Sequence, residues 1–182
     1  MPDVTDSPLR EHSAIAEAEV GMAQETLSAI IDGANPKGDV LSIAELAGVM
    51  AGKRAADLIP LVHPAGLTQL VVNAVPDRAA SAVKIRVETA AFGPTGVEME
   101  ALTAAAVAAL TVYDMIREIE PAAFVRGVKL VANSADGEEE WRRPGEPADP
   151  QRLPKGVRTA GRIVPAPRGG VPAGPGARRR TP

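Results

Sequence analysis

The clearest alternation of apolar and polar positions in the chain lies at residues 82–89, where small aliphatic residues alternate with charged ones. Residues 67–74 are rich in Leu and Val and alternate more weakly, and residues 76–78 between the two runs contain a proline and an aspartate. Such a pair of runs predicts a β-hairpin with one buried face. Residues 127–132 predict a further strand, because they are short, apolar and β-branched.

The periodicity of apolar residues predicts three helices, at residues 22–31, 41–55 and 97–120. Gly33 suits the C-terminal stop of the first helix, and Pro121 ends the third. Ser42, followed three residues later by Glu45, has the spacing of a capping box for the second helix. Residues 1–16 are polar and irregular, and no element is predicted there.

These elements together predict an α+β domain over residues 1–141, with a mainly antiparallel sheet covered by helices on one face. Residues 142–182 are rich in Pro, Gly and Arg and poor in apolar residues. Such a segment cannot bury enough surface to offset its conformational entropy, so a disordered, solvated tail is expected there.

Charge separates the same two parts of the chain. The net charge of −3 is the sum of an acidic body at −11 and a basic tail at +8. An acidic body with 2% aromatic residues argues against nucleic-acid binding by the folded domain. The Arg178–Arg180 end can touch an acidic partner weakly, although a solvated tail is the simpler interpretation.

The composition also excludes several classes of protein and of functional site. The chain has no Cys and only 2 His, which excludes disulfides, thiolate catalysis and zinc or iron–sulfur sites built on Cys. No metal site is therefore expected. The apolar run that begins at Leu102 is rich in Ala and ends at Asp114, which is typical of a buried helix rather than a membrane span. No secretory signal is visible at the N-terminus, so a cytoplasmic location without membrane contact is expected.

The long predicted helix carries charges at both ends of an apolar middle. Glu98 and Glu100 at its start are explained by the helix dipole, whereas Asp114 lies at the negative end and needs another reason. A local ion pair with Arg117, three residues on, is one alternative. Glu100 and Asp114 are about 21 Å apart along the helix, at ~1.5 Å per residue. A single small-molecule site that uses both ends therefore requires a second copy of the chain.

Three other positions invite a functional interpretation. Lys37 lies in a turn before a helix, where an ammonium can bind an anion, although a solvated lysine is the commoner case. The run from Gly48 to Lys53 imitates a phosphate-binding loop but has the wrong spacing, so its glycines are expected to allow close helix packing. His63 lies between prolines that restrict its backbone, which leaves a structural and a functional role equally open.

Taken in order, several segments closely resemble the cyclic pyranopterin monophosphate synthase family of molybdenum-cofactor biosynthesis. The resemblance covers residues 22–132. It rests on KGDVL (residues 37–41), IAELAGVMAGKR (43–54), DLIPLVHP (57–64), TGVEMEALT (95–103) and AALTVYDM (108–115).

The resemblance implies a ferredoxin-like α+β fold, assembled as a homohexamer, a trimer of dimers, with active sites at the dimer interface. It implies a lyase that converts (8S)-3′,8-cyclo-7,8-dihydroguanosine 5′-triphosphate, a GTP-derived substrate, to cyclic pyranopterin monophosphate with release of diphosphate. No redox cofactor is implied, and Mg²⁺ with the phosphates is left open. Such chemistry needs cations for three phosphates and a carboxylate–ammonium pair to move protons.

The resemblance also assigns roles at matching positions. Asp114 matches the catalytic acidic residue, Lys37 a lysine needed for turnover, and Arg117 a position that is usually Lys. Substrate contacts are implied at Leu61, Val62, His63, Met99, Glu100, Lys53 and Glu98. We expect the end that holds Lys37, His63 and Glu100 in one copy to meet the Asp114 and Arg117 end of another.

Departures from the family pattern leave one alternative. The family has Lys where this chain has Arg117 and Asn133, usually Cys at Val62, and basic residues where residues 136–140 are acidic. Arginine is a poor proton donor because its pKa exceeds about 12. The chain is therefore either an active enzyme or a catalytically impaired paralogue that acts as a nucleotide- or partner-binding subunit.

Overall fold

The computed structural model describes residues 1–146, which form one compact unit. The predicted tail lies outside the described residues from residue 147 on. The elements in chain order are β1 (Arg10–Gly21), α1 (Gln24–Ile31), α2 (Val40–Gly52), α3 (Ala55–Leu58), β2 (Leu67–Asp77), β3 (Ala82–Gly93), α4 (Glu98–Ile116), β4 (Phe124–Ala135) and β5 (Trp141–Arg142).

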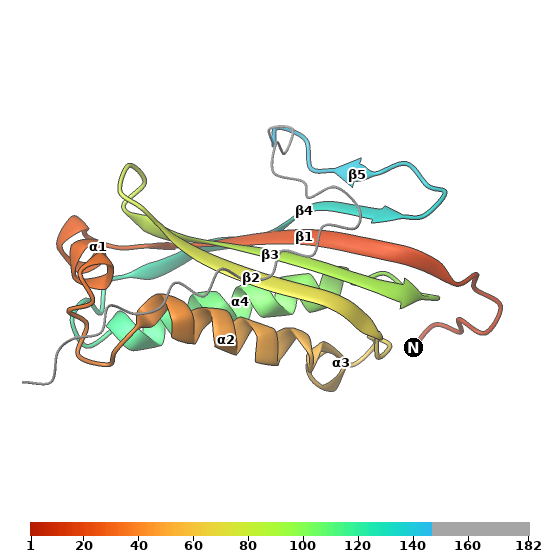
Figure 1. The fold of residues 1–182 in the computed structure, drawn as a ribbon, viewed down its shortest axis with the longest axis horizontal. Coiled ribbons are helices and arrows are strands. Elements are labelled where there is room, and N and C mark those ends of the chain that lie inside the picture. Colours follow the sequence, from red (N-terminus) through yellow and green to blue (C-terminus); the bar gives the residue numbers. More distant parts are fainter. Residues whose placement is uncertain (147–182) are drawn as a thin grey trace, which may run out of the picture. The chain divides into compact units, whose positions relative to one another are not determined.

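The sheet has the order β2-β3-β1-β4-β5, and every neighbouring pair is antiparallel. Helices α2 and α4 run along the same side of it (Figure 1). The chain passes from β1 to β2 through α1, α2 and α3, and β3 lies between these two strands in the sheet. It passes from β3 to β4 through α4, and β1 lies between those two strands. The predicted α+β fold is confirmed. Its first four strands have the ferredoxin-like order, with β5 added beside β4.

The central strand β1 was not predicted, and the interpretation of residues 10–16 as irregular is wrong. One face of β1 is buried and consists of Ala14, Ala16, Ala18 and Val20, each 5% exposed or less. Alanine has a low strand propensity, so the alternation carries little signal in the sequence. Helix α4, which packs on β1, is rich in alanine as well, and its Ala101, Ala105 and Ala109 are fully buried. Small residues on both faces let the helix pack closely on the sheet.

The cap of α2 also differs from the prediction. Asp39, not Ser42, is the N-cap residue: its carboxylate accepts hydrogen bonds from the Ser42 N–H (3.1 Å) and the Ser42 hydroxyl (2.6 Å). The hydroxyl bond is the larger cause that lowers the pKa of Asp39. Glu45 makes no capping box, because its Oε1 accepts from the backbone N–H of Ala74 at 2.9 Å. This contact ties α2 to the edge strand β2.

The two glycines of α2 allow the close packing that was expected of them, because α2 lies directly against α4 and β2. A Cβ at Gly48 would lie 3.1 Å from the Ala104 carbonyl oxygen, and one at Gly52 would lie 3.2 Å from the Glu100 carbonyl oxygen. The resemblance of this run to a phosphate-binding loop therefore has a packing explanation.

Helix α4 is long and apolar enough to cross a membrane by length and composition alone, yet it packs on the sheet as a core helix. The expectation that it is buried on every side is only partly correct. Leu110 is 58% exposed, and Leu102 and Ala106 on the same side are half-buried. Helix α2 leaves Ile43, Leu46 and Met50 exposed as well. We call these six residues the apolar stripe. Exposed apolar residues on neighbouring helices are typical of a surface that interacts with another molecule.

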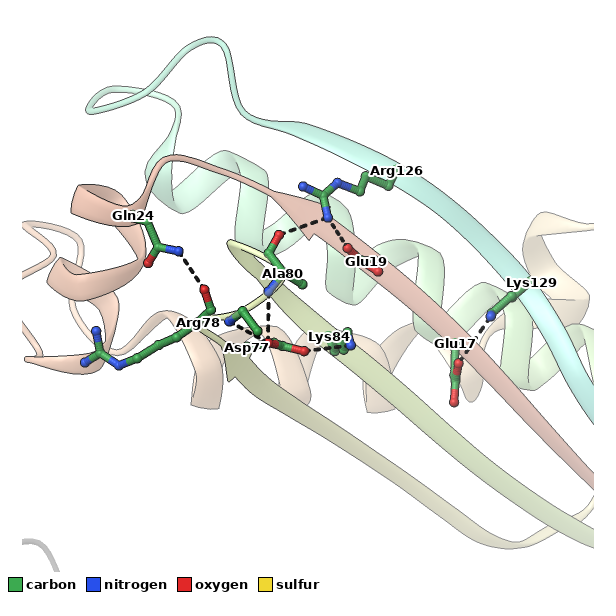
Figure 2. Close-up of polar contacts among 10 residues, drawn as sticks. Glu17, Glu19, Gln24, Asp77, Arg78, Ala80, Lys84, Arg126 and Lys129 are labelled. Atoms are coloured by element: carbon green, nitrogen blue, oxygen red, sulfur yellow. Dashed lines mark hydrogen bonds and ion pairs between the residues drawn. The ribbon is translucent and has the colours of Figure 1, made fainter. Parts of the chain in front are cut away.

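The face of the sheet opposite the helices is polar and is covered by ion pairs between strands. Figure 2 shows Lys84 on β3 paired with Asp77, and Lys129 on β4 near Glu17 on β1. The ammonium-to-carboxylate distances are 2.7 Å and 3.6 Å. Arg126 contacts both Glu19 and the Ala80 carbonyl oxygen. The sheet therefore buries one face against helices and presents a charged face on the other side.

Candidate functional site

The residues singled out in the sequence gather at the two ends of α4. We call the group at its C-terminal end the lysine–aspartate cluster, made of Lys37, Asp114, Arg117 and Glu118. At the N-terminal end lies a cavity of about 110 Å³, here called the glutamate pocket. Gly52, Lys53, Arg54, Pro64, Leu67 and Glu100 are among its lining residues.

Lys37 reaches the end of α4 from the turn that precedes α2. Its ammonium donates to the backbone carbonyl oxygen of Asp114 at 2.8 Å, and lies 3.7 Å from the Asp114 carboxylate and 3.2 Å from that of Glu118. The expectation that Lys37 shares an end with His63 and Glu100 is therefore wrong within one chain. Topology explains the error, because the turn before α2 lies beside the end of α4 and the end of α2 lies beside its start.

The turn that carries Lys37 is anchored by Asn35, which sequence reasoning did not single out. Asn35 is 6% exposed, its side-chain oxygen accepts from the Lys37 N–H at 2.9 Å, and its Nδ2 donates to the Met115 carbonyl oxygen at 3.3 Å. The backbone of Lys37 is therefore held in place beside α4. A lone asparagine in a turn rich in Pro and Gly looks like ordinary turn chemistry, so its sequence signal is weak.

Asp114 lies between two cations. The Arg117 Nε donates to the Asp114 carboxylate at 2.9 Å, so the local ion pair considered as an alternative is present, and the Lys37 ammonium approaches from another segment. The Asp114 and Arg117 side chains are 60% and 55% exposed. Exposed ion pairs contribute at most about 1 kcal/mol to stability. The cluster is therefore poorly explained by stability and leaves a carboxylate and two cations open to a ligand.

Glu100 is the most unusual side chain of the glutamate pocket. It is 3% exposed, and its Oε2 has no hydrogen-bond partner within residues 1–146. Burial, with the charge of Glu98 as a smaller cause, raises the pKa of Glu100 above its ordinary value. A buried carboxyl with a raised pKa keeps its proton to a higher pH than an exposed carboxyl does, which suits a group that donates a proton.

The other predicted contact residues lie on the segments that lead to the pocket or in the first turn of α4. Lys53 ends α2 and lines the pocket. His63 and Val62 are half-buried and Leu61 is exposed, in the loop that leads to Pro64. Met99 is half-buried in the first turn of α4. Glu98, in the same turn, accepts a hydrogen bond from Asn133 on β4 at 2.6 Å.

Two of the acidic residues in the segment 136–140 contact arginine side chains. Glu138 pairs with Arg10 at the start of β1, and Glu140 hydrogen-bonds Arg142 of β5 at 2.6 Å. None of residues 136–140 lines the glutamate pocket. At Glu138 and Glu140, neighbouring arginines therefore compensate the negative charge.

We expect the stability of a Glu100→Gln variant, relative to the parent chain, to increase as pH rises. Because the pKa of Glu100 is raised above 4.5 in the folded chain, the folded state keeps a proton that the unfolded state loses. The free energy of unfolding of the parent therefore falls as pH rises from about 4.5 through the raised pKa, and the variant lacks this fall. Urea midpoints at pH 4.5 and pH 8 measure it. Glu139→Gln, at an exposed carboxylate, is the control, and equal pH dependence of the two variants would contradict the prediction.

The glutamate pocket is too small to hold a nucleotide by itself. Small-molecule pockets measure ~300–1,000 Å³, whereas the glutamate pocket measures about 110 Å³. The two ends lie about 21 Å apart along α4, at ~1.5 Å per residue. Within residues 1–146 no three His, Asp or Glu side chains gather as metal ligands. The arrangement offers two half-sites that combine cations, an exposed carboxylate paired with two of them, and a buried acid.

Comparison with known proteins gives a consistent result. The model of the MoaC family matches residues 1–136. Proteins named cyclic pyranopterin monophosphate synthase are similar to this chain. The one from Chloroflexus aurantiacus is 44% identical over 144 residues, covering 79% of this chain and 88% of the relative. The one from Dinoroseobacter shibae is 47% identical over 130 residues, covering 71% and 82%.

Proposed function

The chain belongs to the MoaC family and is a lyase of molybdenum-cofactor biosynthesis, and we propose that it releases diphosphate from a GTP-derived substrate. The substrate is (8S)-3′,8-cyclo-7,8-dihydroguanosine 5′-triphosphate, and the product is cyclic pyranopterin monophosphate. The two relatives are named as this synthase, and this chain matches more than four-fifths of the length of each. The two half-sites contain the cations and the acid–base groups that such a reaction needs.

The contact of Lys37 with Asp114 is the observation that carries the proposal. The two residues are 77 positions apart, and the ammonium is held at the end of α4 by the Asp114 carbonyl oxygen. A lysine fixed within 3.7 Å of an open carboxylate is a proton-transfer pair. Solvent-exposed ion pairs are common, but this one is fixed by the buried Asn35 beneath the turn.

The groups divide into those that move protons and those that hold charge. Closing the cyclic phosphate joins a hydroxyl oxygen to the phosphorus nearest the sugar and breaks the bond to the diphosphate. Asp114 takes the hydroxyl proton, with Lys37 keeping its carboxylate in place. Arg117 and Lys53 stabilise the charge of the phosphates and of the leaving diphosphate. Arg117 serves here as an anchor, since a guanidinium transfers protons poorly.

A complete site forms when two copies meet through the apolar stripe. Val107 lies midway between Glu100 and Asp114 in the sequence of α4. A two-fold axis near this point pairs the two α4 helices antiparallel, so that the lysine–aspartate cluster of one copy faces the glutamate pocket of the other. A two-fold contact uses the same surface on both copies, and the exposed Leu46, Met50 and Leu110 supply an apolar one.

The proposal extends to a homohexamer, a trimer of such dimers, in the cytoplasm. It requires no redox cofactor, because rearrangement and displacement at phosphorus change no overall oxidation state. Mg²⁺ is a suitable companion of the phosphates. The acidic body of the chain gives no reason to add a nucleic acid or a membrane as a partner.

The direct test is turnover by the purified chain. Incubation with the cyclic dihydro-GTP substrate is expected to produce equal amounts of cyclic pyranopterin monophosphate and diphosphate. Mass spectrometry measures the first product, and a diphosphate assay measures the second. Binding of the substrate without product would contradict the enzymatic proposal and favour the binding-subunit alternative.

Mixing two inactive variants tests the shared site. Asp114→Asn and Glu100→Gln chains are each expected to be nearly inactive. When they are unfolded together and refolded, random pairing makes half of the dimers mixed, and each mixed dimer has one intact site. Activity of about a quarter of the parent value is then expected. If both residues act in the same copy, mixing restores no activity.

A further inference from the structure

The last turn of α4 receives two side chains from the turn at residues 35–37. Backbone carbonyl groups at the C-terminal end of a helix lack partners within the helix. Here the Asn35 Nδ2 donates to the Met115 carbonyl oxygen at 3.3 Å. The Lys37 ammonium donates to the Asp114 carbonyl oxygen at 2.8 Å. Two successive carbonyl groups of α4 are therefore capped by side chains that lie 80 and 77 positions away in the sequence.

Asn35 also fixes the path of the turn itself. Its side-chain oxygen accepts from the Lys37 N–H at 2.9 Å, and its backbone oxygen accepts from the Gly38 N–H at 3.0 Å. Gly38 has a φ of +97°, in the left-handed region that glycine adopts without steric cost. The backbone at Lys37 and at the residue after it is therefore held by hydrogen bonds to a single residue, and that residue is attached to α4.

The exposure of the side chains indicates that the pair of Lys37 and Asp114 is held from beneath rather than by its own burial. Side-chain exposure is 29% for Lys37 and 60% for Asp114, whereas Asn35 is 6% exposed. A lysine side chain has many rotamers, so an exposed ion pair does not by itself keep an ammonium in one place. A buried amide with both ends hydrogen-bonded has a single orientation, because its oxygen must face the turn and its nitrogen must face the helix. Asn35 is therefore the fixed point from which Lys37 extends.

We propose that Asn35 is a positioning residue, which ties the turn of Lys37 to the last turn of α4 and thereby keeps the Lys37 ammonium beside the Asp114 carboxylate. This inference rests on the proposed function, in which that carboxylate takes the proton of the attacking hydroxyl. When the tie is removed, Lys37 keeps its charge but its ammonium moves away from Asp114. The phosphates are still held by Arg117 and Lys53, so the chemical step is affected and substrate binding is not.

Steady-state kinetics of Asn35→Ala and Asn35→Ser test the inference. Asn35→Ala removes both side-chain hydrogen bonds and is expected to lower kcat about 30-fold, since a misplacement of about 1 Å can cost about 10²-fold in rate. KM is expected to stay within about threefold of the parent value. Asn35→Ser keeps an acceptor for the Lys37 N–H, but its hydroxyl ends one bond short of the nitrogen that reaches Met115. Its kcat is therefore expected to fall nearly as far as that of Asn35→Ala.

Glu45→Ala is the matched control for lost stability. The Glu45 carboxylate also ties a helix to a distant segment, but its partner is the Ala74 N–H on β2, at 2.9 Å, rather than the end of α4. We expect the urea midpoints of Glu45→Ala and Asn35→Ala both to fall, and the kcat of Glu45→Ala to stay within about twofold of the parent value. Circular dichroism reports the fold of each variant, and the milder Asn35→Ser carries the test if Asn35→Ala does not fold. Equal losses of kcat in the Glu45 and Asn35 variants would attribute the effect to stability and overturn the inference.

Combination with Asp114→Asn shows whether Asn35 acts through the Asp114 carboxylate. Once that carboxylate is gone, Lys37 has nothing left to hold in place, so Asn35→Ala is expected to lower the kcat of Asp114→Asn by less than about threefold. A further loss of about 30-fold would give Asn35 a separate, structural effect and overturn the inference. Unchanged kcat in Asn35→Ala or Asn35→Ser, with normal turnover by the parent chain, overturns this inference alone. Absence of turnover by the parent chain overturns the proposed function, and this inference with it.

Discussion

Asp114→Asn is expected to lower kcat about 10³-fold, within the range of ~10²–10⁴ that positioned acid–base groups contribute. The amide keeps the size of the side chain and an oxygen that can accept from Arg117, now 2.9 Å from the carboxylate. It cannot take a proton from a hydroxyl. KM is expected to change by no more than about threefold, because the cations that hold the phosphates remain. Initial rates over a range of substrate concentrations measure both constants.

Glu118→Gln is the comparison for this variant. Glu118 lies on the same end of α4, and its carboxylate is 3.2 Å from the Lys37 ammonium, closer than the 3.7 Å of Asp114. A general loss of negative charge around Lys37 would affect both variants alike. We expect Glu118→Gln to lose less than about tenfold in kcat. Equal losses would remove the reason to single out Asp114 as the proton acceptor.

Leu110→Glu is expected to separate the copies and to lower activity by about 10²-fold or more. Leu110 is 58% exposed in a single chain and lies in the apolar stripe between the two ends of α4. A charge placed at an apolar contact costs several kcal/mol when it is buried there. In the separated chain the change is at the surface, so the fold itself is expected to stay intact. Light scattering reports the mass, circular dichroism the fold, and the turnover assay the activity.

Val75→Glu provides the matched substitution on the other face of the molecule. Val75 is 56% exposed on β2, in register with Lys84 on the charged face of the sheet. We expect it to leave mass and turnover close to those of the parent. If Val75→Glu separates the copies and Leu110→Glu does not, the functional contact uses the sheet face rather than α2 and α4.

Local patterns in the chain determined the parts of the fold that depend on near neighbours. The hairpin of β2 and β3 follows from alternating aliphatic residues around a turn, and α4 from a long apolar run bounded by Gly96 and Pro121. The motif segments also indicated the family, because short runs of residues in a fixed order are a property of sequence alone. These features need no knowledge of which elements lie side by side.

The central strand and the role of Glu45 were decided by packing between distant segments. The buried face of β1 is alanine-rich, and it forms a strand where it pairs with β3 and β4 and packs under α4. Glu45 has the spacing of a capping box, yet it binds the backbone of β2, 29 residues away. In both cases a tertiary contact outweighs a weak local preference.

The candidate site shows the same division most clearly. The sequence by itself determined which residues carry chemistry, namely Lys37, Glu98, Glu100 and Asp114, because residue type and motif order are local. Only the tertiary structure decided their grouping: Lys37 joins Asp114 across 77 positions, and Asn133 joins Glu98 across 35. The physical reason is that a side chain's partners are set by which ends of which elements the topology brings together, and periodicity along one segment contains no information about that.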